Sequence, residues 1–213
     1  MLVDNQKPSF AEEELIRAEG YALIAGVDEA GRGALFGPVV AAAVIMPNMI
    51  KAEWREKVRD SKQLSPATRE MLFGYIMDTG IAVGTGSASN KIIERQGIAK
   101  ATYLAMKSAI EMLTTRPQFL LIDYFTLPDF PIPQKGITNG DSLCFTIACA
   151  SIIAKVTRDR MIVRMDRDYP GYGLARHKGY GTREHLECLR RLGPCSAHRR
   201  TFRPVSDIAN GLT

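Results

Sequence analysis

Two adjacent carboxylates end an apolar run near the start of the chain. Asp28 and Glu29 follow the residues YALIAGV and lead into the glycine-rich turn AGRG. Side chains on a strand alternate between its two faces, so these neighbours would diverge unless the strand ends there. An isolated charge is costly to bury, which makes a core role for either side chain unfavourable. The pattern indicates a functional position at a strand end.

Two further aspartates stand at the ends of predicted elements. Asp123 closes the apolar strand QFLLID, and Asp141 begins a long predicted helix, DSLCFTIACASIIAKVTRDRMIVRMDRDY. Neighbouring carboxylates repel one another without a cation, and oxygen-only ligands suit Mg²⁺ or Mn²⁺. Two such ions about 4 Å apart can activate water for phosphodiester hydrolysis. Taken singly, Asp141 also fits a helix cap and Asp123 an ordinary turn residue.

Other common site motifs are absent. The glycines after Glu29 have the spacing GxGxxxG, one residue too long for a dinucleotide fingerprint, and a strand-like run follows where that fold requires a helix. The phosphate loop GxxxxGK[ST] does not occur. No CxxC pair is present among the four cysteines, which favours reduced thiols and argues against a zinc site.

Composition and charge indicate a globular protein with a polyanionic partner. The chain has 213 residues, 24% of them charged, and its longest apolar stretches are shorter than the roughly 20 residues of a membrane span. The acidic N-terminus does not resemble a signal peptide, so we expect a cytoplasmic location. Residues 155–203 carry 13 Lys/Arg against 5 Asp/Glu. Such a basic segment favours nucleic acid as the partner, although a solvated helical face is the alternative.

Alternating strands and helices predict an α/β layer architecture with a helical extension. The residues between the strands YALIAGVDE and GPVVAAAVIM are too few for a crossover helix, so these strands should form an antiparallel hairpin. Ser65 and Gly80 delimit one predicted helix, and Thr182 and Gly193 another. Further elements are the strand IAVGTGSAS and a helix from Gly97 to the residues before Pro117. Residues 124–140 are predicted to form a loop.

An ordered set of segments resembles bacterial ribonuclease HII, the type 2 ribonuclease H. The resemblance extends from about residue 21 to residue 205. The segments that carry it are GVDEAGRG, GPVVAAAVI, DSKQLS, LLID, NGDSLCFTIACASIIAKVTRDRMI, YPGYGLARHKGYGTREHLECLRRLGPCSAHRRTF and the PV at 204–205.

The resemblance implies a fold and an activity. The fold is α/β, a ribonuclease-H-like mixed sheet flanked by helices with a C-terminal helical extension. The expected domains are an N-terminal extension over residues 1–20 and a catalytic domain over 21–213, whose basic helical segment begins near 165. The activity is metal-dependent endonucleolytic cleavage of RNA in RNA/DNA hybrids and 5′ of single ribonucleotides in duplex DNA, as in ribonucleotide excision repair. The products are a 3′-hydroxyl and a 5′-phosphate. We expect a monomer, not bound to a membrane, that uses Mn²⁺ or Mg²⁺.

The resemblance also implies roles for individual residues. The catalytic, metal-binding carboxylates map onto Asp28, Glu29, Asp123 and Asp141. In relatives the Gly-Arg-Gly turn contacts the ribose 2′-hydroxyl and the scissile phosphate, and a tyrosine packs on the following sugar. The corresponding residues here are Gly31, Arg32, Gly33 and Tyr180. A backbone free of side chains can approach a substrate closely, and the 2′-hydroxyl is what distinguishes RNA from DNA. Without the family, Tyr180 fits a half-buried aromatic side chain.

Basic side chains are candidates for phosphate contacts that position a duplex without reading its sequence. Lys62 of the DSK motif is the first candidate. The others are Lys155, Arg158, Lys178, Arg199 and Arg200. Asp159 lies about five turns, ~27 Å, beyond Asp141 along the predicted helix, so we expect it to be structural.

Two positions depart from the family, and two other readings remain. Relatives commonly have lysine at the position of Asn139 and glycine at that of Tyr124, so we expect activity with an altered rate or metal preference. The sister family, ribonuclease HIII, would have an extra N-terminal domain and lack the arginine of the turn. The second alternative is a non-catalytic RNA/DNA-hybrid-binding protein with a decayed metal site, against which the four carboxylates argue.

Overall fold

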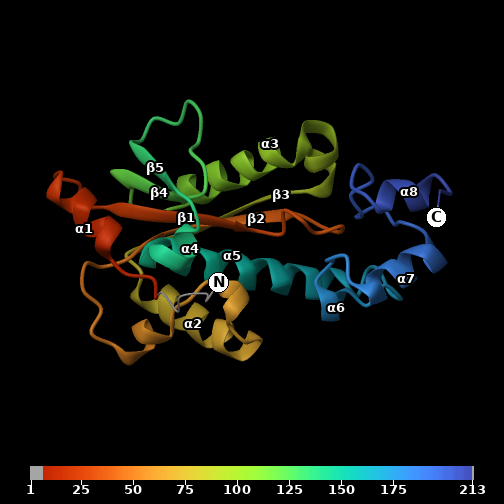
Figure 1. The fold of residues 1–213 in the computed structure, drawn as a ribbon, viewed down its shortest axis with the longest axis horizontal. Helices are drawn as coiled ribbons and strands as arrows, with labels where there is room; N and C mark the ends of the chain where they lie inside the picture. Colours follow the sequence, from red (N-terminus) through yellow and green to blue (C-terminus); the bar gives the residue numbers. More distant parts are fainter. Residues whose placement is uncertain (1–6, 213) are drawn as a thin grey trace, which may run out of the picture.

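A mixed five-stranded sheet forms the centre of the computed structural model, which describes residues 7–212 (Figure 1). Strands β1 (Ile24–Ala30), β2 (Val39–Ile45) and β3 (Ala82–Ala88) form an antiparallel meander. Strands β4 (Phe119–Asp123) and β5 (Gln134–Ile137) continue the sheet on the other side of β1, parallel to it. The order β3-β2-β1-β4-β5 places β1 at the centre. The predicted hairpin and the α/β fold class are therefore confirmed.

Long helices cover both faces of the sheet. Helix α5 (Phe145–Met165) packs on β1 and β2, and α3 (Asn90–Glu111) packs on β2 and β3 from the opposite face (Figure 1). Strand β2 is entirely buried, and its alanines let both helices approach the sheet. At Gly26 of β1 an added Cβ would lie 2.2 Å from the backbone carbon of Thr146. No helix within residues 7–212 is both long and apolar enough to cross a bilayer.

Smaller elements surround α5. Helix α2 (Pro66–Thr79) packs against it, with Ser65 as N-cap and Gly80 as C-cap, as predicted. Two short 3-10 helices, η1 (Glu53–Lys57) and η2 (Ser61–Gln63), precede α2. Beyond the far end of α5 lie α6 (Leu174–His177), α7 (Arg183–Leu192) and α8 (Val205–Ala209), around a separate apolar cluster (Figure 1). Thr182 caps α7 and Gly193 closes it, again as predicted.

Three predicted element boundaries are wrong. The helix expected from Asp141 is broken at Cys144, whose extended backbone separates α4 (Gly140–Leu143) from α5. The predicted loop at 124–140 contains β5, a short edge strand with little apolar patterning. Helix α3 begins at Asn90 rather than near Gly97, because the Ser89 hydroxyl caps it, and Gly97 forms a kink with φ of 79°. The first two boundaries depend on contacts that a local pattern does not contain, whereas the Ser89 cap is a local signal that the sequence analysis missed.

The N-terminal segment is joined to the α4–α5 break. Ser9 accepts a hydrogen bond from the backbone N–H of Phe145 and donates its own to the Leu143 carbonyl. Helix α1 (Ala11–Ala18) carries the buried Glu13, which accepts from the Thr146 N–H at the first turn of α5. Of the predicted extension 1–20, residues 1–6 lie outside the described residues. The part from residue 7 onward therefore packs on the domain that contains the sheet.

A glycine-to-alanine pair tests the contact between β1 and α5. Gly26→Ala should lower the free energy of unfolding by about 2 kcal/mol or more, because the added methyl meets the α5 backbone rather than a flexible side chain. Gly74→Ala in α2 meets no atom within 4 Å and should stabilise the protein by up to about 1 kcal/mol. Chemical denaturation measures both. Equal effects of the two substitutions would contradict the close packing.

Candidate active site

Three of the predicted carboxylates converge at one edge of the sheet. Asp28, Asp123 and Asp141 each place a carboxylate oxygen within 4.8 Å of the others. Asp28 lies near the end of β1 and Asp123 at the end of β4, and these parallel neighbours bring their carboxyl ends to the same edge. Asp141 arrives on α4, and Asp123 Oδ1 accepts a hydrogen bond of 2.7 Å from the Gly140 N–H. The structure thus brings together residues 113 positions apart in sequence.

Glu29 lies beside this carboxylate trio (Asp28, Asp123 and Asp141) rather than within it. Its Oε1 accepts from Arg32 Nη1 at 3.3 Å, and its backbone N–H donates to Asp28 Oδ1 at 2.6 Å. Its Oε2 is buried and has no hydrogen-bond partner among residues 7–212. The negative charge of Asp123 acts on Glu29, so the two carboxylates are near neighbours.

Burial and mutual repulsion disfavour ionisation at this edge. Burial raises the pKa of Asp28, and the charges of Glu29 and Asp123 raise it further. Burial likewise raises the pKa of Asp123, with Asp141 adding to the shift. The pKa of Glu29 is raised by burial, although Arg32 opposes the change. Close carboxylates, an all-oxygen donor set and the unpartnered Oε2 of Glu29 fit a hard divalent cation.

Lys62 places a positive charge at the same edge. Its Nζ lies 3.0 Å from Asp141 Oδ2 and 3.6 Å from Asp60 Oδ1, while its side chain stays 76% exposed. Burial would lower the pKa of Lys62, but the ion pair with Asp141 outweighs it and raises that pKa. Asp60 is an acidic neighbour that sequence reasoning missed, and burial raises its pKa. The DSK motif could have indicated Asp60, because this residue directly precedes η2, the 3-10 helix that carries Lys62.

The two serines beneath these charges were also missed. Ser61 of η2 and Ser151 of α5 share a buried hydrogen bond of 2.9 Å between their hydroxyls. Ser151 lines the cleft together with Asp28, and its hydroxyl opposes the rise in the pKa of Asp28. Arg69 of α2 donates to the Ser61 and Leu64 carbonyls and holds η2 in place. Helices α2 and α5 therefore fix the position of Lys62 relative to the trio.

The Gly-Arg-Gly turn borders the trio, and its two glycines differ. Gly31 has φ of 93°, and an added Cβ there would lie 1.9 Å from Arg158 Nε. Gly33 would meet no atom within 4 Å, so open space lies beside its backbone. The Arg32 guanidinium stands 5.6 Å from the centre of the Phe125 ring. Gly31 is thus required by the fold, and Gly33 leaves an accessible backbone.

One cleft of about 460 Å³ contains most of the predicted residues. Asp28, Glu29, Asp123, the whole Gly-Arg-Gly turn, Lys62 and Tyr180 line it, together with Ser61, Arg69, Ser151 and Lys155. Tyr180 is half-buried, with Lys155 Nζ 5.1 Å from its ring centre and Arg158 at the same distance. Apart from Asp141, the residues that sequence analysis assigned to metal and to substrate therefore share one concave surface.

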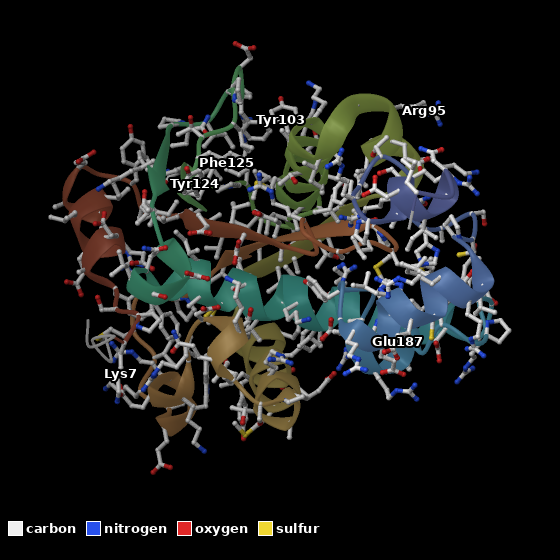
Figure 2. The ribbon with its side chains drawn as sticks, turned by 45° about the vertical axis from the view of Figure 1, so that its right-hand side comes forward. Lys7, Arg95, Tyr103, Tyr124, Phe125 and Glu187 are labelled. Atoms are coloured by element: carbon white, nitrogen blue, oxygen red, sulfur yellow. The ribbon has the colours of Figure 1, made fainter. Side chains whose placement is uncertain are left out.

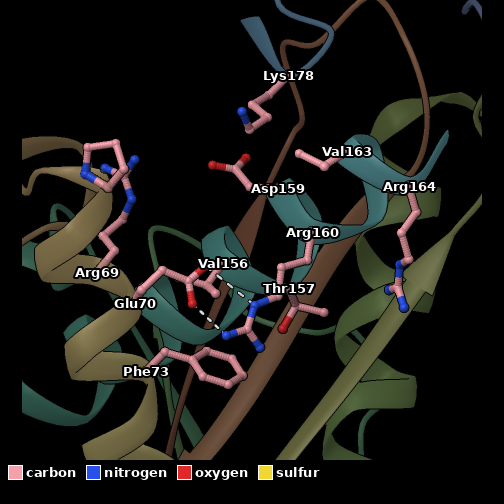
Figure 3. Close-up of a pocket in the computed structure, with 11 residues that line it drawn as sticks. Arg69, Glu70, Phe73, Val156, Thr157, Asp159, Arg160, Val163, Arg164 and Lys178 are labelled. Carbon is pink, nitrogen blue, oxygen red and sulfur yellow. Dashed lines mark hydrogen bonds and ion pairs between the residues drawn. The ribbon is translucent and has the colours of Figure 1, made fainter. Parts of the chain in front are cut away.

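A second cleft of about 760 Å³ lies between α2 and α5 (Figure 3). Arg69 lines both clefts, so they adjoin. Figure 3 shows Arg160 of α5 paired with Glu70 of α2, while Arg164 extends from α5 and Lys178 from the segment after α6. Basic side chains here outnumber the acidic Glu70 and Asp159. The surface next to the carboxylates is therefore suited to a polyanion.

Two predicted phosphate contacts are wrong. Arg158 is fully buried and donates to the carbonyls of Pro38, Phe36 and Lys178. Arg199 is fully buried as well and donates to the carbonyls of Gly37 and Arg32. Buried carbonyls need donors, and a guanidinium supplies several in one plane. Both side chains therefore join loops inside the protein.

The other basic candidates remain available. Arg200 is exposed, and the Lys178 side chain donates to the Ala175 carbonyl. Lys155 forms a 2.7 Å ion pair with Asp159 within α5. Asp159 is thus a partner of Lys155 and no part of the carboxylate trio.

Both positions that depart from the family have left-handed backbones. Asn139 has φ of 56°, and asparagine tolerates this region well. Tyr124, directly after Asp123, has φ of 69°, which is strained for a bulky residue and natural for glycine. Its side chain is 69% exposed and lies next to Phe125 on the loop after β4 (Figure 2). The departure thus places an exposed aromatic ring beside the carboxylate trio.

The cost of the crowded carboxylates predicts a stability gain without metal. In chelator, Asp28→Asn should stabilise the protein by roughly 1 kcal/mol or more, since the amide keeps the acceptor for the Glu29 N–H and removes the charge. The raised pKa means that ionised Asp28 destabilises the fold increasingly as pH rises through that pKa. The gain should therefore be larger near about pH 8 than near about pH 5. Denaturation at both values measures it, with Asp159→Asn as a control that should show no gain.

Comparison with known proteins identifies a family. The model of the family "Ribonuclease HII" matches residues 25–205. A ribonuclease HII of Dehalococcoides mccartyi is 58% identical over 205 residues, which cover 96% of this chain and 97% of the relative. That of Geotalea uraniireducens is 51% identical over 203 residues, covering 95% and 93%.

Solved structures show the same fold. The crystal structure of ribonuclease H2 from Pyrococcus horikoshii superposes with a TM-score of 0.74 at 26% identity, covering 89% of this chain and 98% of that one. A mutant of Bst-RNase HIII gives 0.71 at 22% identity, covering 92% and 72%, and shares the fold alone. The family model and the relatives indicate ribonuclease HII rather than the sister family, ribonuclease HIII. The chain belongs to the ribonuclease HII family and is a metal-dependent ribonuclease H that acts as an endonuclease.

Proposed function

We propose that this enzyme cleaves the RNA strand of RNA/DNA hybrids and incises duplex DNA on the 5′ side of a single ribonucleotide, leaving a 3′-hydroxyl and a 5′-phosphate. The observation that carries the proposal is the carboxylate trio: Asp28 and Asp123 line one cleft with the open Gly33 backbone and the Tyr180 ring, and Asp141 lies beside these two carboxylates. Hydrolysis of a phosphodiester bond and recognition of the adjoining ribose can then occur in the same place. The proposal takes the enzyme to act as a monomer in the cytoplasm.

The metal-holding residues follow from the same geometry. Asp28, Asp123 and Asp141 would hold the ions, and Glu29 would add its unpartnered oxygen. Mg²⁺ or Mn²⁺ at such a site supplies activation of the attacking water and stabilisation of charge on the leaving oxygen. The carboxylates act as ligands in this proposal and form no covalent bond with the substrate.

Lys62 and the adjoining basic side chains would position the duplex. Lys62 is mostly exposed, so its ammonium group can exchange Asp141 for a phosphate oxygen at small cost. Lys155 and the second cleft continue the positive surface. Contacts of this kind bind any sequence and weaken as salt rises.

The turn and the tyrosine would supply the preference for a ribonucleotide. A Gly33 backbone with open space beside it can lie against a ribose, where the 2′-hydroxyl offers both a donor and an acceptor. Tyr180 presents an aromatic face at the other side of the cleft, suited to packing on a sugar. A non-catalytic hybrid-binding protein is the alternative function, and a cleavage assay separates the two.

Incision of a defined duplex tests the activity. A DNA duplex with one ribonucleotide, incubated with Mg²⁺ or Mn²⁺, should be cut 5′ of that ribonucleotide, and chelation should stop the reaction. Asp123→Asn should lower the rate by at least about 100-fold, because the amide keeps the Gly140 hydrogen bond but loses the charge. Gel analysis of end-labelled strands measures the products. Asp78→Asn, at an exposed position of α2 outside both clefts, serves as control and should cut normally, whereas an uncut duplex with the intact enzyme under both metals would refute the proposal.

A single methyl group tests the role of the turn. Gly33→Ala should change the free energy of unfolding by no more than about 0.5 kcal/mol, because the methyl points into open space. It should lower kcat/KM on the single-ribonucleotide duplex by about tenfold or more, because that space would be taken by the ribose. Gly74→Ala is the control and should leave kcat/KM unchanged. Full activity of the Gly33 variant would remove this backbone from substrate recognition.

A further inference from the structure

All three histidines of the chain lie together, away from the carboxylate trio. His177, His185 and His198 are buried in the C-terminal helical region. The rings of His177 and His185 stack at 4.3 Å, and Nε2 of His185 lies 3.1 Å from Nε2 of His198. The proposed hydrolysis uses none of them. Three buried imidazoles in contact need a physical explanation, because each must satisfy two ring nitrogens.

The neighbours determine which nitrogen of each ring carries the proton. Nδ1 of His185 lies 2.9 Å from the Tyr180 carbonyl, which only accepts, so this nitrogen must donate. Nε2 of a neutral His185 then accepts, and Nε2 of His198 must donate to it. Nδ1 of His198 in turn accepts from the backbone N–H of Cys195 at 3.1 Å. One continuous chain of donors and acceptors, His185–His198–Cys195, results.

This chain of hydrogen bonds requires neutral rings. A second proton on His185 or His198 would set two donors against each other. Burial supports the neutral state, since it lowers the pKa of His185 to about 4 and that of His198 to about 3. A shared metal ion is excluded by the same geometry, because the two nitrogens of His198 already face different partners.

The histidines hold the backbone on both sides of the Tyr180 Cα. His177 Nε2 donates to the Tyr172 carbonyl, and its Nδ1 accepts from the Gly179 N–H at 3.2 Å. His185 holds the carbonyl of Tyr180 itself. The Gly179 N–H and the Tyr180 carbonyl are tied to buried rings, and the Tyr180 N–H donates to the His177 carbonyl at 3.1 Å, so the direction in which the Tyr180 side chain leaves the backbone is restricted.

The same cluster joins the tyrosine to the Gly-Arg-Gly turn. The Gly179 carbonyl accepts from the Leu35 N–H at 2.8 Å, just after the turn. His198 pairs with Phe36 in an isolated bridge, and the Arg199 N–H donates to the Leu35 carbonyl at 2.8 Å. The two loops proposed to sense the ribonucleotide are therefore tied to one buried structure.

We propose that His185 is a positioning residue that sets the Tyr180 ring against the substrate through its hydrogen bond to the Tyr180 carbonyl, and that His198 keeps His185 in the required tautomer. The inference rests on the proposed role of Tyr180 in substrate recognition. It assigns to the buried histidines a contribution to specificity without any contact with substrate or metal.

A matched pair of substitutions separates the two hydrogen bonds of His185. The amide nitrogen of asparagine can replace the donor Nδ1, and the amide oxygen of glutamine can replace the acceptor Nε2. His185→Asn therefore keeps the bond to Tyr180 and loses the one to His198, whereas His185→Gln does the reverse. The glutamine variant should lose about tenfold in kcat on the single-ribonucleotide duplex. The asparagine variant should stay within about threefold, and duplex binding and Mn²⁺ affinity should not change in either.

Tyr180→Ala distinguishes failure of the inference from failure of the proposed function. If Tyr180→Ala loses kcat on this duplex and the two His185 variants do not differ, the positioning role is wrong and the function stands. If Tyr180→Ala cuts as well as the wild type, the role of Tyr180 itself is wrong, and the inference falls with it. Equal losses in both His185 variants that merely follow their melting temperatures indicate a structural role and overturn the inference.

A measurement on the unmodified protein keeps the inference testable if a variant fails to fold. Nitrogen-15 NMR of the histidine side chains should show a proton on Nδ1 of His185 and on Nε2 of His198 at neutral pH. The opposite tautomer at His185 would place a lone pair against the Tyr180 carbonyl and overturn the proposal.

Discussion

Repulsion between buried carboxylates is the constraint around which this molecule is organised. Asp28 belongs to the central strand, which is hydrogen-bonded to β2 on one side and β4 on the other. Asp28 cannot move away from Asp123 without breaking that ladder, and Asp141 is tied to Asp123 through the Gly140 N–H. The sheet therefore holds these carboxylates close together although they repel one another. A divalent cation bound by these carboxylates, as proposed, would relieve this repulsion.

The apolar core supplies the stability that this arrangement requires. Helices α5 and α3 bury both faces of the sheet against alanine- and glycine-containing strands. Short side chains let the α5 backbone lie against β1. A Cβ added at Gly26 would lie 2.2 Å from the backbone carbon of Thr146. Ser151 on the same helix lines the cleft together with Asp28, so the element that stabilises the sheet also forms part of the cleft wall.

Buried cations connect the C-terminal region to the cleft. Arg158 and Arg199 donate to carbonyls within and after the Gly-Arg-Gly turn and near Tyr180, and burial lowers the pKa of Arg199 to about 9. Two of the basic side chains on which the prediction of a polyanionic partner rests are thus buried and donate to carbonyl groups of the protein itself. Of the other basic residues of this segment, Arg160, Arg164 and Lys178 line the second cleft, which adjoins the cleft that contains Lys62.

Local patterns were sufficient for elements with strong end signals and for the types of chemistry. Ser65 and Gly80 delimit α2, Thr182 and Gly193 delimit α7, and apolar runs that stop at Asp28 and Asp123 mark strand ends. These signals lie within a few residues of the feature they specify. The resemblance added the grouping of the carboxylates and the role of the turn, which spacing alone did not specify.

Contacts between distant residues decided the rest. The break at Cys144 depends on Ser9 and Glu13, more than 130 positions away, and the burial of Arg158 depends on carbonyls some 120 positions earlier. A sequence shows that a side chain is basic or can hydrogen-bond, but its partner depends on how the chain returns on itself. The types of chemistry in the cleft can therefore be predicted from single residues, whereas the contacts between those residues cannot. The pairing of Lys62 with Asp141 and the chain of histidines behind Tyr180 exist only in the folded structure.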